Sequence, residues 1–293
     1  MRTRACLAAA VATVLVNWMG GCAGPAPKPA PPSSPAEAEP MRPGAVAPAS
    51  PGPGAPAGAA APAVSGAGAR DVLPGVRLDL AARTVEFDGI VPIDAHDPDA
   101  PNVYLELMVC TADTREHESL VVTRVRAAHV HAALLMLGLS PGSPGNFEPA
   151  DAGPRVTPPT GPSVAVMVRW RLPDGSERTG DLHEWVVSAR DGRRFGTPTP
   201  EQAGVRLPGG FCFAGSRTVR RADPGTGRMA DTYEADGGGT LVGLCTFGSE
   251  TIAWRQVISP DAGAQEPEWI ADRRIVPKVG TAVTVVLRPL DRN

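Results

Sequence analysis

Residues 23–69 set the first limit on the fold, because they cannot form a folded core. Proline, alanine and glycine fill 36 of these 47 positions, and the segment contains no phenylalanine, tryptophan or tyrosine. Such a composition buries too little apolar surface to offset the entropy that the chain loses on ordering. We therefore expect a disordered tether, with a root-mean-square span of about 40 Å as a flexible coil, followed by a folded domain at 70–293. That domain carries a net charge of −5, so nucleic-acid binding is not expected.

An export signal precedes the tether. Arg2 and Arg4 are followed by an apolar run over residues 5–16, which is too short to span a membrane. The next motif, Met19-Gly20-Gly21-Cys22, resembles the bacterial lipobox and implies a lipid-modified Cys22 at the mature N-terminus. The alternative is ordinary cleavage near Ala23, which discards this cysteine. We expect residues 1–22 to be a lipoprotein-type signal peptide. We expect the protein to be lipid-anchored in the cell envelope, in the outer membrane facing the periplasm or the cell surface.

The pattern of the folded region predicts an α+β fold that is mostly β. Short apolar or alternating runs bounded by turn residues predict strands, which we expect to form one or more antiparallel sheets. These runs cover residues 76–80, 84–91, 103–110, 120–125, 164–172, 210–214, 241–245 and 282–287. The segment 182–188 has no clear type, and Gly237-Gly238-Gly239 is interpreted as a turn. Pro224-Gly225-Thr226-Gly227 is interpreted as the tip of a hairpin.

One helix is expected at about residues 129–137. Its apolar residues recur at the spacing of a single helix face, and Gly138 stands where a helix-ending glycine belongs. The proline- and glycine-rich segment 139–162 follows. A connection of that length is uncommon inside a compact domain, so it is a possible boundary between two lobes.

The residues before this helix predict a hairpin with a polar site. If the strands at 103–110 and 117–125 turn at Asp113 and Thr114, then Cys110 faces His117 and Val109 faces Glu118. Directly opposed residues share one face of the sheet. The helix is expected to pack on the other, apolar face, which carries Leu105 and Leu107.

Five stretches carry a family resemblance. They are Arg115-Glu116-His117-Glu118-Ser119-Leu120, His129–Gly138, His183-Glu184-Trp185-Val186, Phe213-Ala214-Gly215-Ser216 and Gly280-Thr281-Ala282-Val283-Thr284. In this order they resemble the YdjY-like family of bacterial proteins, over about residues 71–290. The family's activity is unassigned, and the description of its founding member as ferredoxin-like implies an iron–sulfur or redox association. Where the family often has Asn-Phe-Pro-Ser, this chain has Thr246-Phe247-Gly248-Ser249.

The cysteine count argues against an intrinsic iron–sulfur cluster. Such a cluster needs four thiolates, and only Cys110, Cys212 and Cys245 lie in the folded region. An exported protein meets an oxidising compartment, so a Cys212–Cys245 disulfide is a candidate, with two independent buried thiols as the alternative. A nucleophilic site is also a candidate, with Cys110 as the thiol and His117 as its base. The alternative is that Cys110 is a small core residue.

Histidines suggest a metal site as a further candidate. His117, Glu118, His129 and His131 are ligand types that suit zinc. His129 and His131 share a face only if the chain is extended there, because two positions on a helix are about 200° apart. The alternative is that His129 precedes or caps the helix and His131 packs between helix and sheet. We predict no cofactor, with zinc as the exception.

No sequence signature of a known enzyme class is present. We therefore expect a lipid-anchored envelope protein with a non-catalytic binding role towards an envelope protein, a glycan or a small ligand. The alternative is a metal- or thiol-dependent envelope enzyme. It would use Cys110 and His117, or a metal held by His117, His129 and His131.

Lipidation can be tested on the mature protein. Mass spectrometry of the N-terminus should find an acylated Cys22, and the Cys22→Ala form should leave the membrane fraction. An unmodified N-terminus beyond residue 22 would exclude the anchor.

Overall fold

The computed structural model describes residues 68–148, 150, 153–198, 209–222 and 225–290. The signal peptide, Cys22 and all but the last two residues of the tether lie outside this part of the chain. The described residues belong to one compact unit, so the segment 139–162 does not divide the domain into two lobes. Within the described part, the helices lack the length and apolar character that a membrane span requires.

The described elements are mostly strands. They are β1 (Arg70–Leu73), β2 (Val76–Asp79), β3 (Thr84–Ile90), β4 (Leu107–Thr111), β5 (Ser119–Thr123), β6 (Asn146–Glu148), β7 (Arg155–Thr157), β8 (Ser163–Arg171), β9 (Glu177–Asp181), β10 (Val186–Ser188), β11 (Phe211–Phe213), β12 (Thr218–Ala222), β13 (Met229–Tyr233), β14 (Val242–Gly243), β15 (Ile252–Trp254), β16 (Trp269–Ala271) and β17 (Ala282–Pro289). The helices are α1 (Ala127–Met136), α2 (Glu234–Gly238) and the 3₁₀ turns η1 (Glu116–Glu118) and η2 (Leu182–Trp185).

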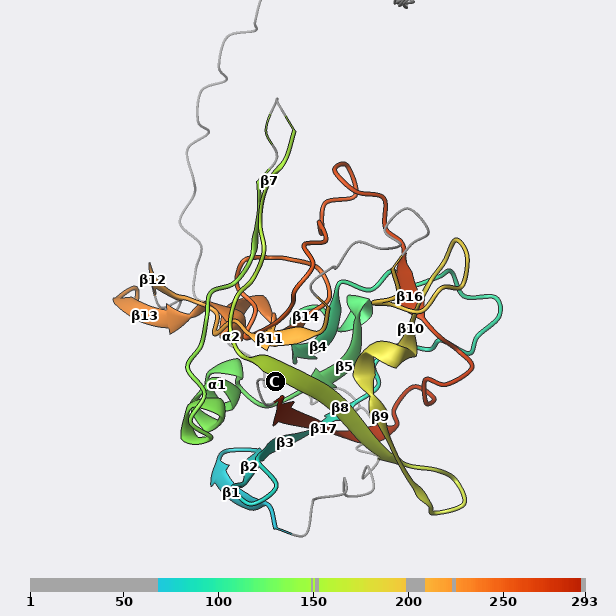
Figure 1. The fold of residues 1–293 in the computed structure, drawn as a ribbon, viewed down its shortest axis with the longest axis horizontal. Coiled ribbons are helices and arrows are strands. Elements are labelled where there is room, and N and C mark those ends of the chain that lie inside the picture. Colours follow the sequence, from blue (N-terminus) through green and yellow to red (C-terminus); the bar gives the residue numbers. More distant parts are fainter. Residues whose placement is uncertain (1–67, 149, 151–152, 199–208, 223–224, 291–293) are drawn as a thin grey trace, which may run out of the picture. The chain divides into compact units, whose positions relative to one another are not determined.

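Eight strands close into a barrel (Figure 1). Their order is β3-β17-β8-β11-β15-β14-β4-β5, and β5 returns to β3 through the pair Ile90 and Val122. Strands β2 and β1 extend the sheet from β3, and β9 pairs with β8. Most pairs are antiparallel as expected, but β4 with β5 and β14 with β15 are parallel. The fold is therefore a mixed barrel rather than a set of antiparallel sheets.

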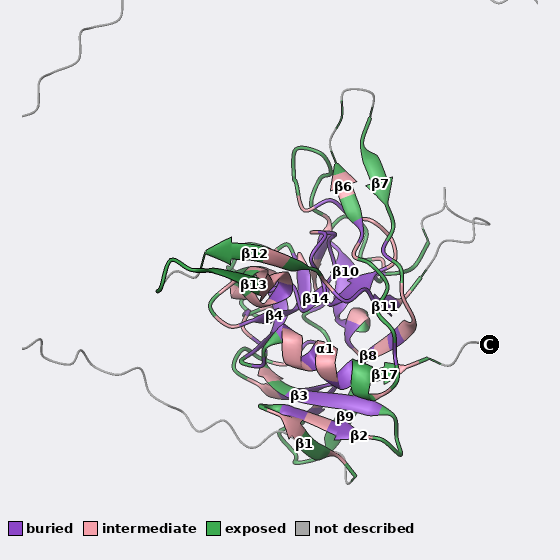
Figure 2. Ribbon diagram, turned by 90° about the vertical axis from the view of Figure 1, so that its left-hand side faces the viewer, coloured by how far each residue is buried: buried purple, intermediate pink, exposed green. Residues whose placement is uncertain are grey.

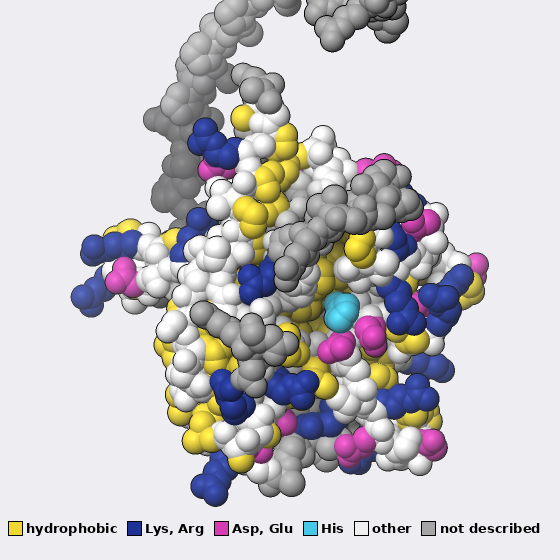
Figure 3. Space-filling view, viewed as in Figure 1, with side chains coloured by type: hydrophobic (Ala, Val, Ile, Leu, Met, Phe, Trp, Pro, Cys, Tyr) yellow, Lys and Arg dark blue, Asp and Glu magenta, His cyan; other side chains and the backbone are white. Residues whose placement is uncertain are grey.

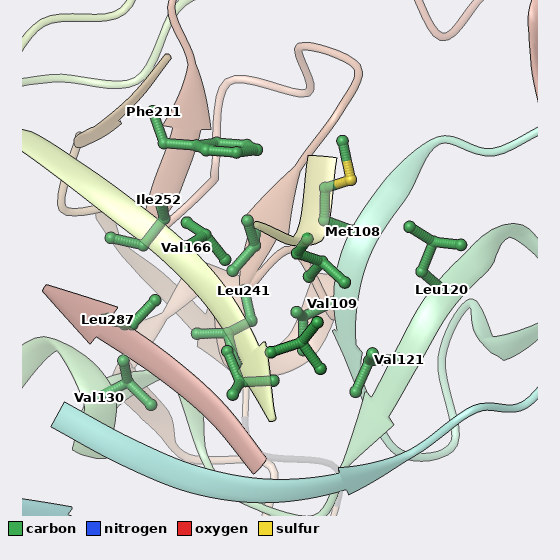
Figure 4. Close-up of a cluster of buried hydrophobic side chains, with 14 of the residues drawn as sticks. Met108, Val109, Leu120, Val121, Val130, Val166, Phe211, Leu241, Ile252 and Leu287 are labelled. Carbon is green, nitrogen blue, oxygen red and sulfur yellow. The ribbon is translucent and has the colours of Figure 1, made fainter. Parts of the chain in front are cut away.

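Side chains from the inward faces of the strands fill the barrel. In β8 every second side chain is buried, from Val164 to Trp170, and in β17 the inward residues Val283, Val285 and Leu287 are buried. A ring of eight strands leaves an interior just wide enough for side chains to fill. Figure 4 shows this filling, with side chains from several strands meeting around Leu241 and Val166. By contrast, the β6–β7 and β12–β13 hairpins are largely exposed (Figure 2).

Helix α1 confirms the expected helix and begins two residues earlier, at Ala127. Gly138 has a φ of +82°, and its N–H donates to the Leu135 carbonyl at 2.8 Å. The Leu139 N–H donates to the Leu134 carbonyl at 3.2 Å, so the helix ends in a Schellman motif. The helix packs against β1, β2, β3 and α2, and not on the expected hairpin.

The expected hairpin is wrong because β4 and β5 run parallel. Leu107 lies opposite Ser119 and Cys110 lies opposite Val122. Both strands are buried along their whole length, which is typical of parallel strands covered on both faces. Residues 103–106 do not belong to this strand, because Leu105 donates its N–H to the Trp269 carbonyl at 2.8 Å.

The connection between these parallel strands is the seven residues 112–118, fewer than the dozen or more that a parallel crossover usually needs. Side chains hold the backbone where a longer crossover would use a helix. The Glu116 carboxylate accepts the N–H groups of Asp113 and Thr114. The Ser119 hydroxyl donates to the Arg115 carbonyl at 2.7 Å. Hydrogen bonds from its own backbone N–H and from those of Asp113 and Thr114 lower the pKa of Glu116, so the carboxylate stays charged where the turn needs an acceptor.

Two smaller expectations also changed. The untyped segment 182–188 is η2 followed by β10, and the glycine run ends the short helix α2, with Gly239 at a φ of +73°. The other hairpin, expected with its tip at residues 224–227, is confirmed by its arms, because β12 and β13 pair antiparallel; Pro224 itself lies outside the described residues. On the face in Figure 3, basic and acidic side chains are interspersed, without a continuous basic surface.

Closure of the barrel can be tested at Gly89. A Cβ there would lie 2.6 Å from Val121 Cγ1 and 2.8 Å from the Val122 carbonyl oxygen. We expect Gly89→Ala to lower the free energy of unfolding by about 2 kcal/mol, because β5 must shift away from β3. Gly209→Ala is the matched control, since nothing lies within 4 Å of its Cβ position. Equal urea midpoints for the two variants would contradict this role of Gly89.

Candidate functional site

A small pocket lies where the parallel pair β4–β5 meets the loop between β15 and β16. Its volume is about 220 Å³. We call it the acidic pocket and define it by six of its wall residues: Glu106, Glu118, Cys245, Ser259, Gln265 and Trp269. Glu118 and Cys245 were singled out in the sequence, whereas Glu106 was not.

The parallel register brings the two carboxyl groups together. Because Leu107 lies opposite Ser119, the residues before them, Glu106 and Glu118, are neighbours. The Glu106 N–H donates to the Glu118 carbonyl at 3.0 Å. The two carboxyl groups can share a hydrogen bond only when one of them is protonated, since a carboxylate only accepts.

The guanidinium group of Arg115 lies near both carboxyl groups. The Arg115 guanidinium Nη1 lies 2.6 Å from Glu106 Oε2 and 3.5 Å from Glu118 Oε2. Burial, the hydrogen bond to Glu118 and the repulsion of its charge raise the pKa of Glu106 to about 7, against the opposing effect of Arg115. A carboxyl group that titrates near neutrality beside a pocket marks a functional-site candidate.

The loop Thr246-Phe247-Gly248-Ser249, which departs from the family pattern, contacts the Arg115 side chain of the site. The Arg115 guanidinium carbon lies 4.6 Å from the centre of the Phe247 ring, a cation–π distance. Glu250 Oε1 accepts the N–H groups of Phe247 and Gly248, so a buried carboxyl group fixes the loop. Burial raises the pKa of Glu250, and its Oε2 has no hydrogen-bond partner among the described residues.

The expected pair of Cys110 and His117 is not formed. Cys110 is fully buried and packs with Leu107 and Val122, whereas the His117 side chain is 75% exposed. The reason is the parallel register, which places Val122 rather than His117 opposite the cysteine. Burial raises the pKa of the Cys110 thiol, which disfavours the thiolate that a nucleophile requires.

The candidate metal ligands lie in three places. His117 Nε2 is 3.6 Å from Glu118 Oε1 at the edge of the acidic pocket. His129 Nδ1 lies 3.4 Å from the Pro74 carbonyl oxygen. His131 lies 2.9 Å from the Tyr233 hydroxyl and 3.1 Å from the Gly215 carbonyl, and burial lowers its pKa. In the described ranges, no three His, Cys, Asp or Glu side chains are grouped to hold a metal ion.

The three cysteines of the domain are free thiols in separate packing clusters. Cys212 lies in β11 opposite Ala253, and Cys245 lies in the wall of the acidic pocket. The Cys212–Cys245 disulfide is therefore not formed in this structure. Burial raises the pKa of Cys212 to about 11 and raises that of Cys245 further, with the nearby carboxyl groups adding to the effect.

The raised pKa of Glu106 has a consequence for stability. The pKa of Glu106 is about 7 in the folded protein, above its ordinary value of 4.5. The folded state therefore binds more protons between these values, and its stability falls as pH rises through them. We expect Glu106→Gln to remove much of this fall. The gain at about pH 8 should be on the order of 1 kcal/mol after solvent screening. Urea unfolding at about pH 5 and pH 8 measures it, with Glu177→Gln on exposed β9 as control. A cost for Glu106→Gln that does not change with pH would contradict the raised pKa of Glu106.

Comparison with known proteins identifies the family. No curated protein and no solved structure matches the chain. The YdjY domain matches residues 76–288, which run from β2 to the last residues of β17 and include every residue of the acidic pocket. This match confirms the resemblance found in the sequence: the chain belongs to the YdjY domain family.

Proposed function

We propose that this protein is an exported, lipid-anchored module of the bacterial cell envelope that binds a small cationic group in the acidic pocket. The export signal and the lipobox-like motif at Cys22 support the location. The paired carboxyl groups of Glu106 and Glu118 in the wall of the pocket carry the proposed binding role.

The chemistry of the pair favours a cation as ligand. With the pocket empty, the proton between Glu106 and Glu118 relieves the repulsion that Arg115 alone leaves uncompensated. An ammonium or guanidinium group supplies positive charge at the same place and three or more N–H donors. Such a ligand replaces the proton and lets Glu106 ionise.

The size of the pocket limits the ligand further. Its volume of about 220 Å³ is below the 300–1,000 Å³ of typical small-molecule sites. A group the size of one amino-acid side chain fits, so the ligand is an amine on a larger molecule or a small free amine. Trp269 provides an apolar wall for the carbon chain, because its ring is buried and lines the pocket.

A second candidate is an enzyme that uses the pair for general acid–base catalysis. The observation that favours it is the pKa of Glu106 at about 7, near the pH at which such a group transfers protons most effectively. The thiol-dependent alternative is less well supported, because burial raises the pKa of all three cysteines.

Cation binding can be measured by calorimetry with butylammonium, and with 1-butanol as its neutral match. We expect butylammonium alone to bind. Its affinity should increase by up to about tenfold for each unit by which the pH rises, until the pH reaches the pKa of Glu106. Glu118→Gln should weaken binding by at least about tenfold, because it removes one of the two charges. Glu177→Gln should leave it unchanged.

Two outcomes would contradict the proposal. One is equal binding of butylammonium and 1-butanol, which would mean that the pocket recognises only the carbon chain. The other is full binding by Glu118→Gln, which would move the site elsewhere.

A further inference from the structure

Helix α1 lacks the polar outer face that surface helices usually have. Its buried side consists of Ala127, Val130, Ala133 and Leu134. The two polar side chains of the helix do not make a solvated face, because His129 and His131 contact other elements. At the C-terminal end, Leu135 and Met136 are 46% and 53% exposed. The described part of the domain therefore presents two large apolar side chains side by side with no partner.

The position of α1 in the domain suggests what covers this end. The helix packs against β1, which begins at Arg70, two residues after the first described residue (Figure 1). The apolar helix thus belongs to the part of the domain where the preceding 67 residues join it. If Cys22 is anchored and residues 23–69 form the tether expected from the sequence, a span of about 40 Å as a flexible coil keeps this part of the domain near the bilayer. At such a local concentration even a weak surface is effective.

A basic side chain lies beside the helix. Arg70, which opens the strand β1 that packs against α1, is exposed. In Figure 3 hydrophobic side chains gather over α1 and the β1–β2 hairpin, with basic and acidic side chains around them. An apolar surface flanked by arginine is typical of interfacial membrane binding, in which each basic residue near anionic headgroups adds attraction.

We infer that the C-terminal end of α1 docks onto the membrane surface. Leu135 and Met136 enter the headgroup layer, and Arg70 meets anionic headgroups. The inference rests on the proposed function in one respect, since the lipid anchor brings this surface to the bilayer. The contact orients the domain on its tether, so that the protein does not rely on the linker alone.

Vesicle binding tests this surface without the anchor. The mature chain, residues 22–293, is produced without acylation and sedimented with vesicles of phosphatidylcholine alone or mixed with phosphatidylglycerol. We expect binding to the mixed vesicles that weakens with added salt. Replacing both Leu135 and Met136 by Glu should reduce it by at least about fivefold, because two charges enter the contact. Met229→Glu is the matched control: Met229 is 54% exposed in β13, and this variant should bind as the unaltered chain does.

Three results would overturn the inference. They are no binding of the unaltered chain to the mixed vesicles, full binding by the doubly substituted chain, and equal loss in the Met229→Glu control. Thermal unfolding verifies that the variants are folded, and Leu135→Ser with Met136→Ser replaces the Glu pair if they are not. Because the chain is unlipidated and the acidic pocket is unaltered, a failed anchor or a failed pocket leaves this result interpretable.

Discussion

The parallel pairing of β4 with β5 is the constraint on which the rest of the molecule depends. It places Leu107 opposite Ser119 and thereby sets Glu106 beside Glu118. The same strand β5 reaches β3 through Ile90 and Val122 and closes the barrel. A slip of one residue would turn every side chain of β5 to the other face. Both the acidic pocket and the filled interior would then be lost.

The crossover that permits this pairing is stabilised by polar groups rather than by hydrophobic packing. Glu116 accepts two backbone N–H groups, and the Thr114 hydroxyl donates to the Thr111 carbonyl at 2.5 Å. The Thr111 N–H donates in turn to the Gly239 carbonyl at 3.3 Å. Each of these bonds contributes about 1 kcal/mol. Together they fix seven residues in a conformation that the apolar pattern does not specify.

Several motifs that carry the family resemblance turn out to serve the fold. His131 in α1, Gly215 after β11 and Tyr233 in β13 form one hydrogen-bonded group, which Thr251 extends through a 2.9 Å contact with the tyrosine hydroxyl. The group joins three elements that are distant in sequence. Trp185 likewise packs edge-to-face against Trp170 in the core. Glu106 and Glu250 instead depart from the usual exposure of carboxyl groups, because burial raises the pKa of both. Such departures are expected at functional sites.

The sequence by itself determined what depends on neighbouring residues. The alternation in β8 identified a strand with one buried face, and Gly138 marked the end of α1, because one residue in the left-handed region stops a helix regardless of its surroundings. The family also followed from short motifs. Only the tertiary structure decided the direction of β5 and the identity of its partners. Side-chain periodicity reveals which face of a strand is buried, but the neighbour of that strand is chosen by residues far along the chain. Glu106 illustrates the difference, because nothing local distinguishes it from other glutamates, and its pKa of about 7 arises from burial and from Glu118, against the opposing effect of Arg115.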